Sequence, residues 1–132
     1  MIRLLLVDDQ LAVRRGLGMR LALEPDMLIV GEASNGREAL TMAQTLSPDV
    51  VLMDVEMPTM DGITTTAALR TTVPQSAVVI LSIHDDVLTR TRAQTAGAMA
   101  FVEKSGTTEA LIVAIRQVAH QRTESEDTHT DR

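Results

Sequence analysis

The stretch VVLMD, residues 50–54, places four apolar side chains in a row and ends in a carboxylate. Successive side chains of a strand point to opposite faces of the sheet, so an apolar run without alternation predicts a strand covered on both faces. Strands of this kind are typical of parallel sheets with helices on either side. A charged residue is rarely found at the end of a buried apolar strand, so Asp54 needs a separate explanation.

Four more short apolar runs are spaced along the chain, and longer segments with helical patterning separate them. The runs are IRLLLV (2–7), MLIVGEA (27–33), AVVILS (77–82) and AMAFV (98–102). Together with residues 50–53 they predict five strands that alternate with five helices. This order favours an α/β domain with a parallel sheet and helices on both faces.

The helical segments differ in the strength of their signals. Asn35 and Glu38 have the spacing of a capping box at the start of the second helix. Asp61-Gly62 predicts a turn that leads into the third helix. The fourth segment, residues 86–96, has few apolar side chains and several β-branched threonines, so we expect the weakest helix there.

Composition limits the classes of function. The 132 residues predict one domain over residues 1–120, followed by a disordered tail over 121–132 that has no apolar side chain. Without cysteine there are no disulfides and no thiolate zinc sites, which suits a cytoplasmic protein. A net charge of −6 argues against direct binding of nucleic acid, and no apolar run approaches the length of a membrane span.

Polar residues end four of the predicted strands. Asp8 and Asp9 follow the first run, Asp54 the third and Ser82 ends the fourth, while the fifth runs into Glu103-Lys104. The carboxyl ends of parallel strands share one edge of the sheet, where ligands bind in open α/β folds. If the first and third strands are neighbours, the three aspartates lie close together.

Three carboxylates at close range require either protonation or a cation between them. Oxygen ligands with open positions suit Mg²⁺, which prefers a phosphate oxygen as a further ligand. Lys104 can reach a phosphate, and Ser82 offers a hydroxyl donor. This set of groups predicts phosphoryl transfer to an aspartate.

The motifs LLLVDDQLAVRRGL, VVLMDVEMPTMDG, VVILS and GAMAFVEK resemble the receiver domain of two-component response regulators. The likeness covers residues 2–120 and is greatest to the subfamily that carries a LuxR-type helix-turn-helix domain. It implies a flavodoxin-like fold with strand order 2-1-3-4-5. No such DNA-binding domain follows here, so the chain is either a stand-alone receiver or a fragment.

The resemblance also implies a role for each residue of the site. Asp54 is the expected phosphoacceptor, and a sensor histidine kinase is the expected donor of the phosphoryl group. Mg²⁺ is expected on the side chains of Asp9 and Asp54 and on the backbone carbonyl of Glu56, with Asp8 acting largely through water. Lys104 is expected to pair with Asp54 and then with the phosphoryl group.

Two further positions match switch residues of the family. The Ser82 hydroxyl is expected to turn toward the phosphoryl group, and Phe101, the only aromatic residue, stands at the switch position. The resemblance implies that the fourth helix, fifth strand and fifth helix are then remodelled, with transcription, a partner contact or a homodimer as the output. The alternative for Phe101 is a ring that only fills space.

Other interpretations stay open at this point. His84 is either an exposed loop residue or, with Glu56, a group that tunes hydrolysis of the phosphoryl group. Arg90 and Arg92 are expected on a solvated face. The protein is expected not to be an enzyme. Two alternatives to a phosphorylated receiver domain stay open: a receiver-like interaction module that is never phosphorylated, and a haloacid-dehalogenase-like phosphatase. That phosphatase needs D-x-D, whereas Asp54 is followed by Val55-Glu56.

Overall fold

A computed structural model of the chain describes residues 1–57 and 59–130, with side chains as far as residue 122. Strands and helices alternate along the chain as the apolar runs predict. In order they are β1 (Ile2–Val7), α1 (Leu11–Leu21), β2 (Met27–Ala33), α2 (Gly36–Leu46), β3 (Val50–Asp54), α3 (Gly62–Thr72), β4 (Ala77–Ser82), α4 (Val87–Ala96), β5 (Ala100–Glu103) and α5 (Thr108–Thr130).

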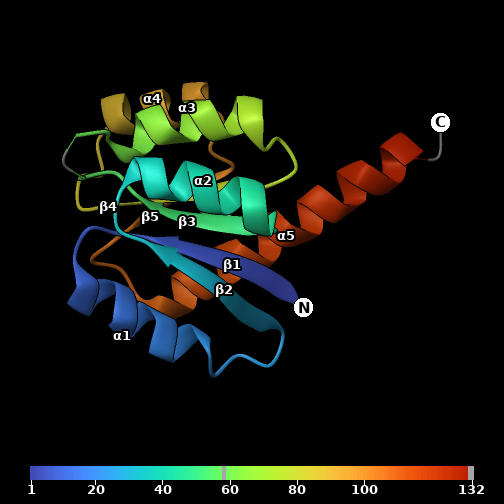
Figure 1. Ribbon diagram of the computed structural model, residues 1–132, viewed down its shortest axis with the longest axis horizontal. Helices are drawn as coiled ribbons and strands as arrows, with labels where there is room; N and C mark the ends of the chain where they lie inside the picture. The colour runs from blue at the N-terminus through green and yellow to red at the C-terminus, as the bar shows by residue number, and fades with distance from the viewer. Residues whose placement is uncertain (58, 131–132) are drawn as a thin grey trace.

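The five strands form one parallel sheet in the order β2-β1-β3-β4-β5. Figure 1 shows α2, α3 and α4 on one face of this sheet and α1 and α5 on the other. The predicted flavodoxin-like architecture is therefore confirmed. The order reverses between β1 and β3, so the carboxyl ends of these two neighbouring strands form the switch point where ligands bind in such folds.

Burial on both faces explains why the strand sequences are continuously apolar. Leu4 and Leu6 of β1 face a core that α1 and α5 cover, with Leu21 and Ile115 fully buried in it. Leu5 of β1 faces a second core under α2, α3 and α4, and so do alternate residues of β3 and β4. A strand between two such cores has no solvent side and therefore no polar alternation.

The fifth strand begins later than the sequence predicts. Residues 98–102 were the expected run, whereas β5 spans Ala100–Glu103. Gly97 ends α4 in the left-handed conformation, and the backbone N–H of Ala98 donates to the carbonyl of Ala93. Ala98 thus completes the C-terminal cap of the helix, which delays the strand.

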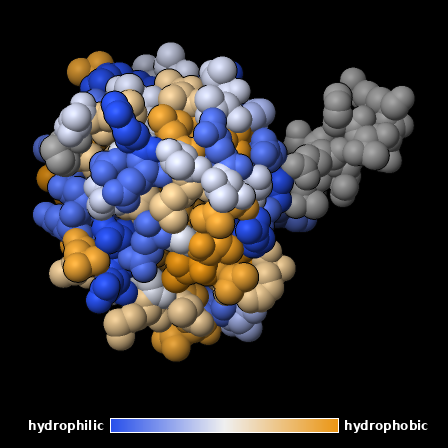
Figure 2. Space-filling model, viewed as in Figure 1, coloured by the Kyte–Doolittle hydropathy of each residue, from blue (hydrophilic) through white to orange (hydrophobic). Residues whose placement is uncertain are grey.

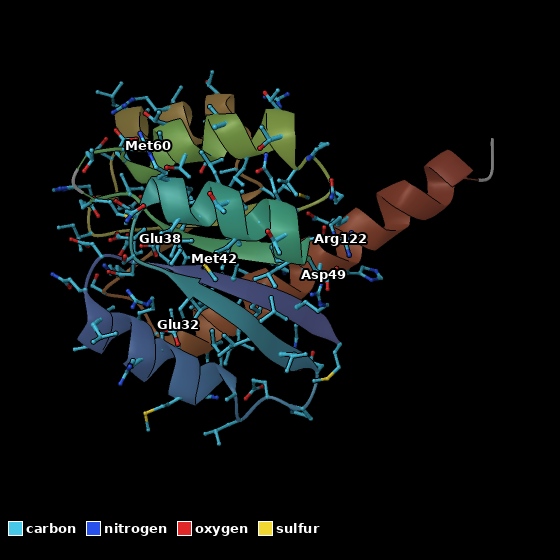
Figure 3. The ribbon with its side chains drawn as sticks, in the orientation of Figure 1. Glu32, Glu38, Met42, Asp49, Met60 and Arg122 are labelled. Atoms are coloured by element: carbon cyan, nitrogen blue, oxygen red, sulfur yellow. The ribbon has the colours of Figure 1, made fainter. Side chains whose placement is uncertain are left out.

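Aspartate and asparagine side chains start three of the helices. Asn35, Asp61 and Asp86 each accept a hydrogen bond from a backbone N–H of the first turn of α2, α3 and α4. The carboxylate of Glu38 (labelled in Figure 3) turns back to accept from the backbone N–H of Ser34. This confirms the predicted cap at Asn35, with the return bond made one residue earlier than in the usual capping box.

Ion pairs fasten α5 to the edge of the sheet that lies away from the strands' carboxyl ends. Arg122 Nη2 lies 2.8 Å from Asp49 Oδ1, just before β3, and both residues are labelled in Figure 3. Arg116 bridges to Glu24 at 2.7 Å and to Asp26 at 2.9 Å. These pairs orient the helix against the loops that precede β2 and β3.

The backbone of α5 continues farther than the sequence predicts. A disordered tail was expected over residues 121–132, but the helix runs to Thr130 and projects beyond the sheet in Figure 1. Residues 131–132 lie outside the described part of the chain. A helix anchored by packing needs no new nucleus, and each added residue gains a backbone hydrogen bond. The division at residue 120 stays a prediction.

The surface mixes polar and apolar side chains. Figure 2 shows apolar side chains gathered near the middle of the face on which β2 and α2 lie in Figure 1. Leu28 of β2 is 48 % exposed. The register of β1 against β2 shifts between Leu4 and Leu5, and such a bulge disfavours addition of a further strand at the edge. Among the described residues, no helix has the length and apolar character to cross a membrane.

Close packing behind the end of β3 predicts that Gly62 cannot be replaced. A Cβ at this position would lie 2.1 Å from the carbonyl oxygen of Asp54 and 2.9 Å from Cγ of Met53. Gly62→Ala should therefore lower the free energy of unfolding in urea by about 1–3 kcal/mol or more, because the backbone of β3 must shift. Gly16→Ala is the matched control: among the described residues, no atom beyond the neighbouring backbone of α1 lies within 4 Å of its Cβ, so a gain of about 0.5–1 kcal/mol is expected. Equal effects of the two changes would contradict this account of the packing.

Candidate functional site

The predicted site residues meet at the carboxyl edge of the sheet. Asp54 is the last residue of β3 and pairs in register with Leu81 of β4, one residue before Ser82. Ser82 in turn pairs with Glu103 of β5, and its carbonyl accepts a 2.8 Å hydrogen bond from the backbone N–H of Lys104. Ladder hydrogen bonds between neighbouring strands thus set the backbone positions of the site.

Three aspartates form an acidic cluster at the switch point. Asp8, Asp9 and Asp54 each offer a carboxylate oxygen, and these oxygens lie within 4.8 Å of one another. Asp8 and Asp54 are buried, while Asp9 is exposed. Oδ1 of Asp54 is buried and, among the described residues, accepts no hydrogen bond of good geometry, although Nζ of Lys104 lies 3.3 Å from it. A hard divalent cation fits this donor set, because it would satisfy that oxygen and offset the clustered negative charge.

Lys104 supplies the positive charge of the cluster. Its Nζ lies 2.8 Å from Oδ2 of Asp8 and 3.3 Å from Oδ1 of Asp54. Burial acts to lower the pKa of Lys104, but the hydrogen bond to Asp8 and the charge of Asp54 outweigh it and raise that pKa. The sequence predicted an ion pair with Asp54; the structure adds a closer contact with Asp8.

Burial also perturbs the carboxyl group of Asp54. Only 1 % of this residue is exposed. Desolvation, followed by the negative charge of Asp8, raises the pKa of Asp54 to about 7, although Lys104 acts in the opposite direction. A group with this pKa changes charge near neutrality, and a bound cation would favour the ionised form.

Ser82 is held by two neighbours. Its hydroxyl donates to Oε1 of Glu56 at 3.1 Å and accepts from the backbone N–H of His84 at 3.0 Å. The imidazole Nε2 of His84 lies 3.9 Å from the same carboxylate oxygen, and its side chain is 61 % exposed. Glu56 and His84 therefore stand beside Ser82, as their spacing suggested, but sequence reasoning missed the Ser82–Glu56 hydrogen bond. The spacing of Glu56 from Asp54 is the only sequence signal for it.

Phe101 is half-buried on β5 and packs at the margin of the core beneath α4. The guanidinium carbon of Arg90 lies 4.6 Å from the ring centroid, a cation–π contact. Arg90 also pairs with Asp85, in the loop that follows Ser82. Arg90 and Arg92 are exposed, as the sequence predicted, and the structure adds that Arg90 links this loop to the ring. No residue pattern in the sequence signals the contact.

A parallel sheet with an acidic cluster and a lysine at its switch point defines a class of α/β domains that bind ligands at the carboxyl ends of their strands. The chain belongs to the response regulator receiver domain family, whose model matches residues 4–116. The resemblance noted in the sequence is thereby confirmed.

Individual relatives carry the same domain in longer proteins. The chain is 35 % identical over 118 residues to the transcriptional regulatory protein DegU of Brevibacillus brevis, covering 89 % of this chain and 50 % of that one. It is 38 % identical over 106 residues to a protein-glutamate methylesterase/protein-glutamine glutaminase of Methanospirillum hungatei, covering 79 % and 30 %. The chain thus spans half or less of the length of these curated relatives.

A solved structure shows the same arrangement. The crystal structure of a two-component response regulator of the LuxR family from Aurantimonas matches with a TM-score of 0.87 and 31 % identity. The match covers 91 % of this chain and 86 % of that one. This agrees with the predicted likeness to receivers of the LuxR-type subfamily.

The raised pKa of Asp54 predicts that this residue destabilises the metal-free protein. An unfolded aspartate titrates near 4, so the contribution of Asp54 is favourable below about pH 4 and is lost as the pH rises through about 7. In buffer with a chelator at pH 8, Asp54→Asn should raise the free energy of unfolding by about 2–4 kcal/mol. The gain should shrink when urea unfolding is repeated at pH 5.

Asp61→Asn is the matched control, because asparagine caps a helix about as well as aspartate. Its free energy of unfolding should stay within about 0.5 kcal/mol of the parent at both pH values. A loss of stability in Asp54→Asn at pH 8 would show that the carboxylate is not strained by its burial.

Proposed function

We propose that the protein is a phosphoacceptor that takes a phosphoryl group onto Asp54 from the phosphohistidine of a sensor histidine kinase. The observation that carries this proposal is the buried carboxylate of Asp54 beside Asp8 and the ammonium group of Lys104. Among the described residues, Oδ1 of Asp54 accepts no hydrogen bond of good geometry and has a 3.3 Å ion pair with Lys104. Membership of the receiver family supports the same assignment.

The residues around Asp54 suit an in-line transfer. A carboxylate oxygen of Asp54 attacks phosphorus while the phosphorus–nitrogen bond breaks, and the departing imidazole nitrogen keeps the electron pair. Lys104 pairs with a phosphoryl oxygen, and the hydroxyl of Ser82 donates to another. Mg²⁺, held by Asp9, Asp54 and the Glu56 carbonyl with Asp8 acting through water, would neutralise charge on the transferring group.

The output is proposed to follow from the charge change at Asp54. Movement of Ser82 toward the phosphoryl group would pull on the loop that contains Asp85, and through Arg90 on Phe101. The face formed by α4, β5 and α5 would then change, and α4, with many threonines, is suited to a low-cost rearrangement. Formation of a homodimer is one form that this change could take.

The relatives indicate the setting but differ in output. A transcriptional regulator supports control of transcription, whereas the methylesterase shows that a similar domain occurs in an enzyme. We therefore assign no catalytic output to this domain itself. The net charge of −6 supports a domain that does not contact nucleic acid directly, and the lack of cysteine suits the cytoplasm.

Incubation with Mg²⁺ and a small acyl phosphate tests the proposal directly. Intact-mass spectrometry should find one phosphoryl adduct, which is lost with chelator and in Asp54→Asn. Rapid turnover of varied phosphomonoesters would instead support the phosphatase. The absence of any adduct would favour an interaction module that is never phosphorylated.

Decay of the same adduct tests the tuning role of His84 and Glu56. Because His84 is exposed and lies 3.9 Å from Glu56, we propose that the pair positions or excludes water near the phosphoryl group. The lifetime of the adduct should change by at least about threefold in His84→Ala, a change that corresponds to a modest difference in barrier. An unchanged lifetime would remove His84 from the account.

The position of Phe101 predicts a variant that separates phosphorylation from the response. Phe101→Ala should leave the initial rate of adduct formation within about twofold, because the ring packs against the apolar core and under the guanidinium of Arg90 and is not one of the groups proposed to hold the phosphoryl group. Amide NMR shifts of α4 and β5 that move on phosphorylation in the parent should move much less. Arg90→Ala should reproduce part of this loss. If phosphorylation itself fails in a folded Phe101→Ala protein, the ring fills space and does not switch.

A further inference from the structure

We propose that the side chain of Glu56 restrains Ser82 in the unphosphorylated protein and so opposes the phosphorylated state. This inference rests on the proposed function, since it concerns the step in which Ser82 turns toward the phosphoryl group. It assigns Glu56 a positioning role that is distinct from the metal contact of its backbone carbonyl and from tuning of hydrolysis.

The hydrogen-bond capacity of Ser82 sets up a competition. Its hydroxyl carries one proton, which is donated to Oε1 of Glu56 at 3.1 Å. Ser82 is fully buried, so no water replaces a lost partner easily. The same proton cannot serve Glu56 and a phosphoryl oxygen at once. Binding of the phosphoryl group by Ser82 therefore requires that the bond to Glu56 break.

Breaking that bond is costly on the side of Glu56. Its second carboxylate oxygen, Oε2, is already buried without a hydrogen-bond partner among the described residues. Loss of Ser82 would leave Oε1 without its hydroxyl donor as well, so the carboxylate must find another partner when the bond breaks. The side chain is 33 % exposed, so it can turn outward to water when the phosphoryl group arrives.

The backbone keeps Glu56 opposite Ser82. Beyond the end of β3, the N–H of Val55 still donates to the carbonyl of Leu81 at 3.1 Å, which extends the pairing with β4 by one residue. The N–H of Met57 then donates to the carbonyl of Val55. The loop is thereby tied to β4 at the residue before Ser82, so the restraint is built into the strand ends.

A double-mutant cycle with a phosphoryl mimic tests the restraint. The four proteins are the parent, Glu56→Ala, Ser82→Ala and the double variant, and the probe is beryllium fluoride with Mg²⁺, titrated by calorimetry. Glu56→Ala should bind the probe about three- to tenfold more tightly than the parent, which is the effect expected for loss of one hydrogen bond in the free state. In the Ser82→Ala background the same change should tighten binding at least about threefold less.

The cycle separates restraint from simple charge repulsion. Removal of a negative charge near an anionic probe tightens binding whether or not Ser82 is present. Equal tightening in both backgrounds would therefore contradict the restraint. Glu109→Ala, which removes an exposed glutamate paired with Arg20 on α1, is the control and should leave the affinity unchanged.

The result also distinguishes failure of the inference from failure of the proposed function. If the parent binds no beryllium fluoride and forms no phosphoryl adduct at Asp54, the proposed function falls. If the parent binds the probe and Glu56→Ala binds it no more tightly, the phosphoacceptor stands and the restraint is wrong. A greater gain in the presence of Ser82, measured on four variants that are all folded, supports the restraint.

Discussion

The close approach of two buried carboxylates and one ammonium group is the constraint on which the site depends. Asp8 and Asp54 share Lys104, and the exposed Asp9 adds a further negative charge. One positive charge cannot balance three carboxylates, so the cluster is strained until a proton or a divalent cation joins it. The same strain makes Asp54 a carboxylate that gains from acquiring new partners.

The fold maintains this strain because the packed sheet holds the charged side chains of the site closer together than their mutual repulsion favours. The sheet is packed on both faces, and its ladder hydrogen bonds continue to the residues that carry the charges. Gly62 lets the start of α3 lie directly against the carbonyl of Asp54. The cost of holding the charges together is therefore met by the two apolar cores, and local rearrangement cannot relieve it.

Much of the fold and site could be predicted from the sequence, because the signals lie in short stretches and recur at the end of each strand. Continuous apolar runs predicted buried parallel strands, and polar residues at their ends predicted where Asp54, Ser82 and Lys104 meet. The pairing of individual side chains could not be predicted from these signals. The ion pair of Lys104 with Asp8 and the stacking of Arg90 on Phe101 depend on side-chain rotamers and on distances between elements. The length of α5 was also missed, because its polar end contains no packing signal.

Chemical mapping of the phosphorylated carboxylate tests the central claim most directly. Borohydride reduces an acyl phosphate to an alcohol, so a phosphorylated aspartate becomes homoserine while free carboxylates do not react. After treatment with acyl phosphate and Mg²⁺, peptide mass spectrometry should find homoserine at position 54 alone, and none when Mg²⁺ is omitted. Homoserine at position 8 or 9, or at 54 without a divalent cation, would contradict the account.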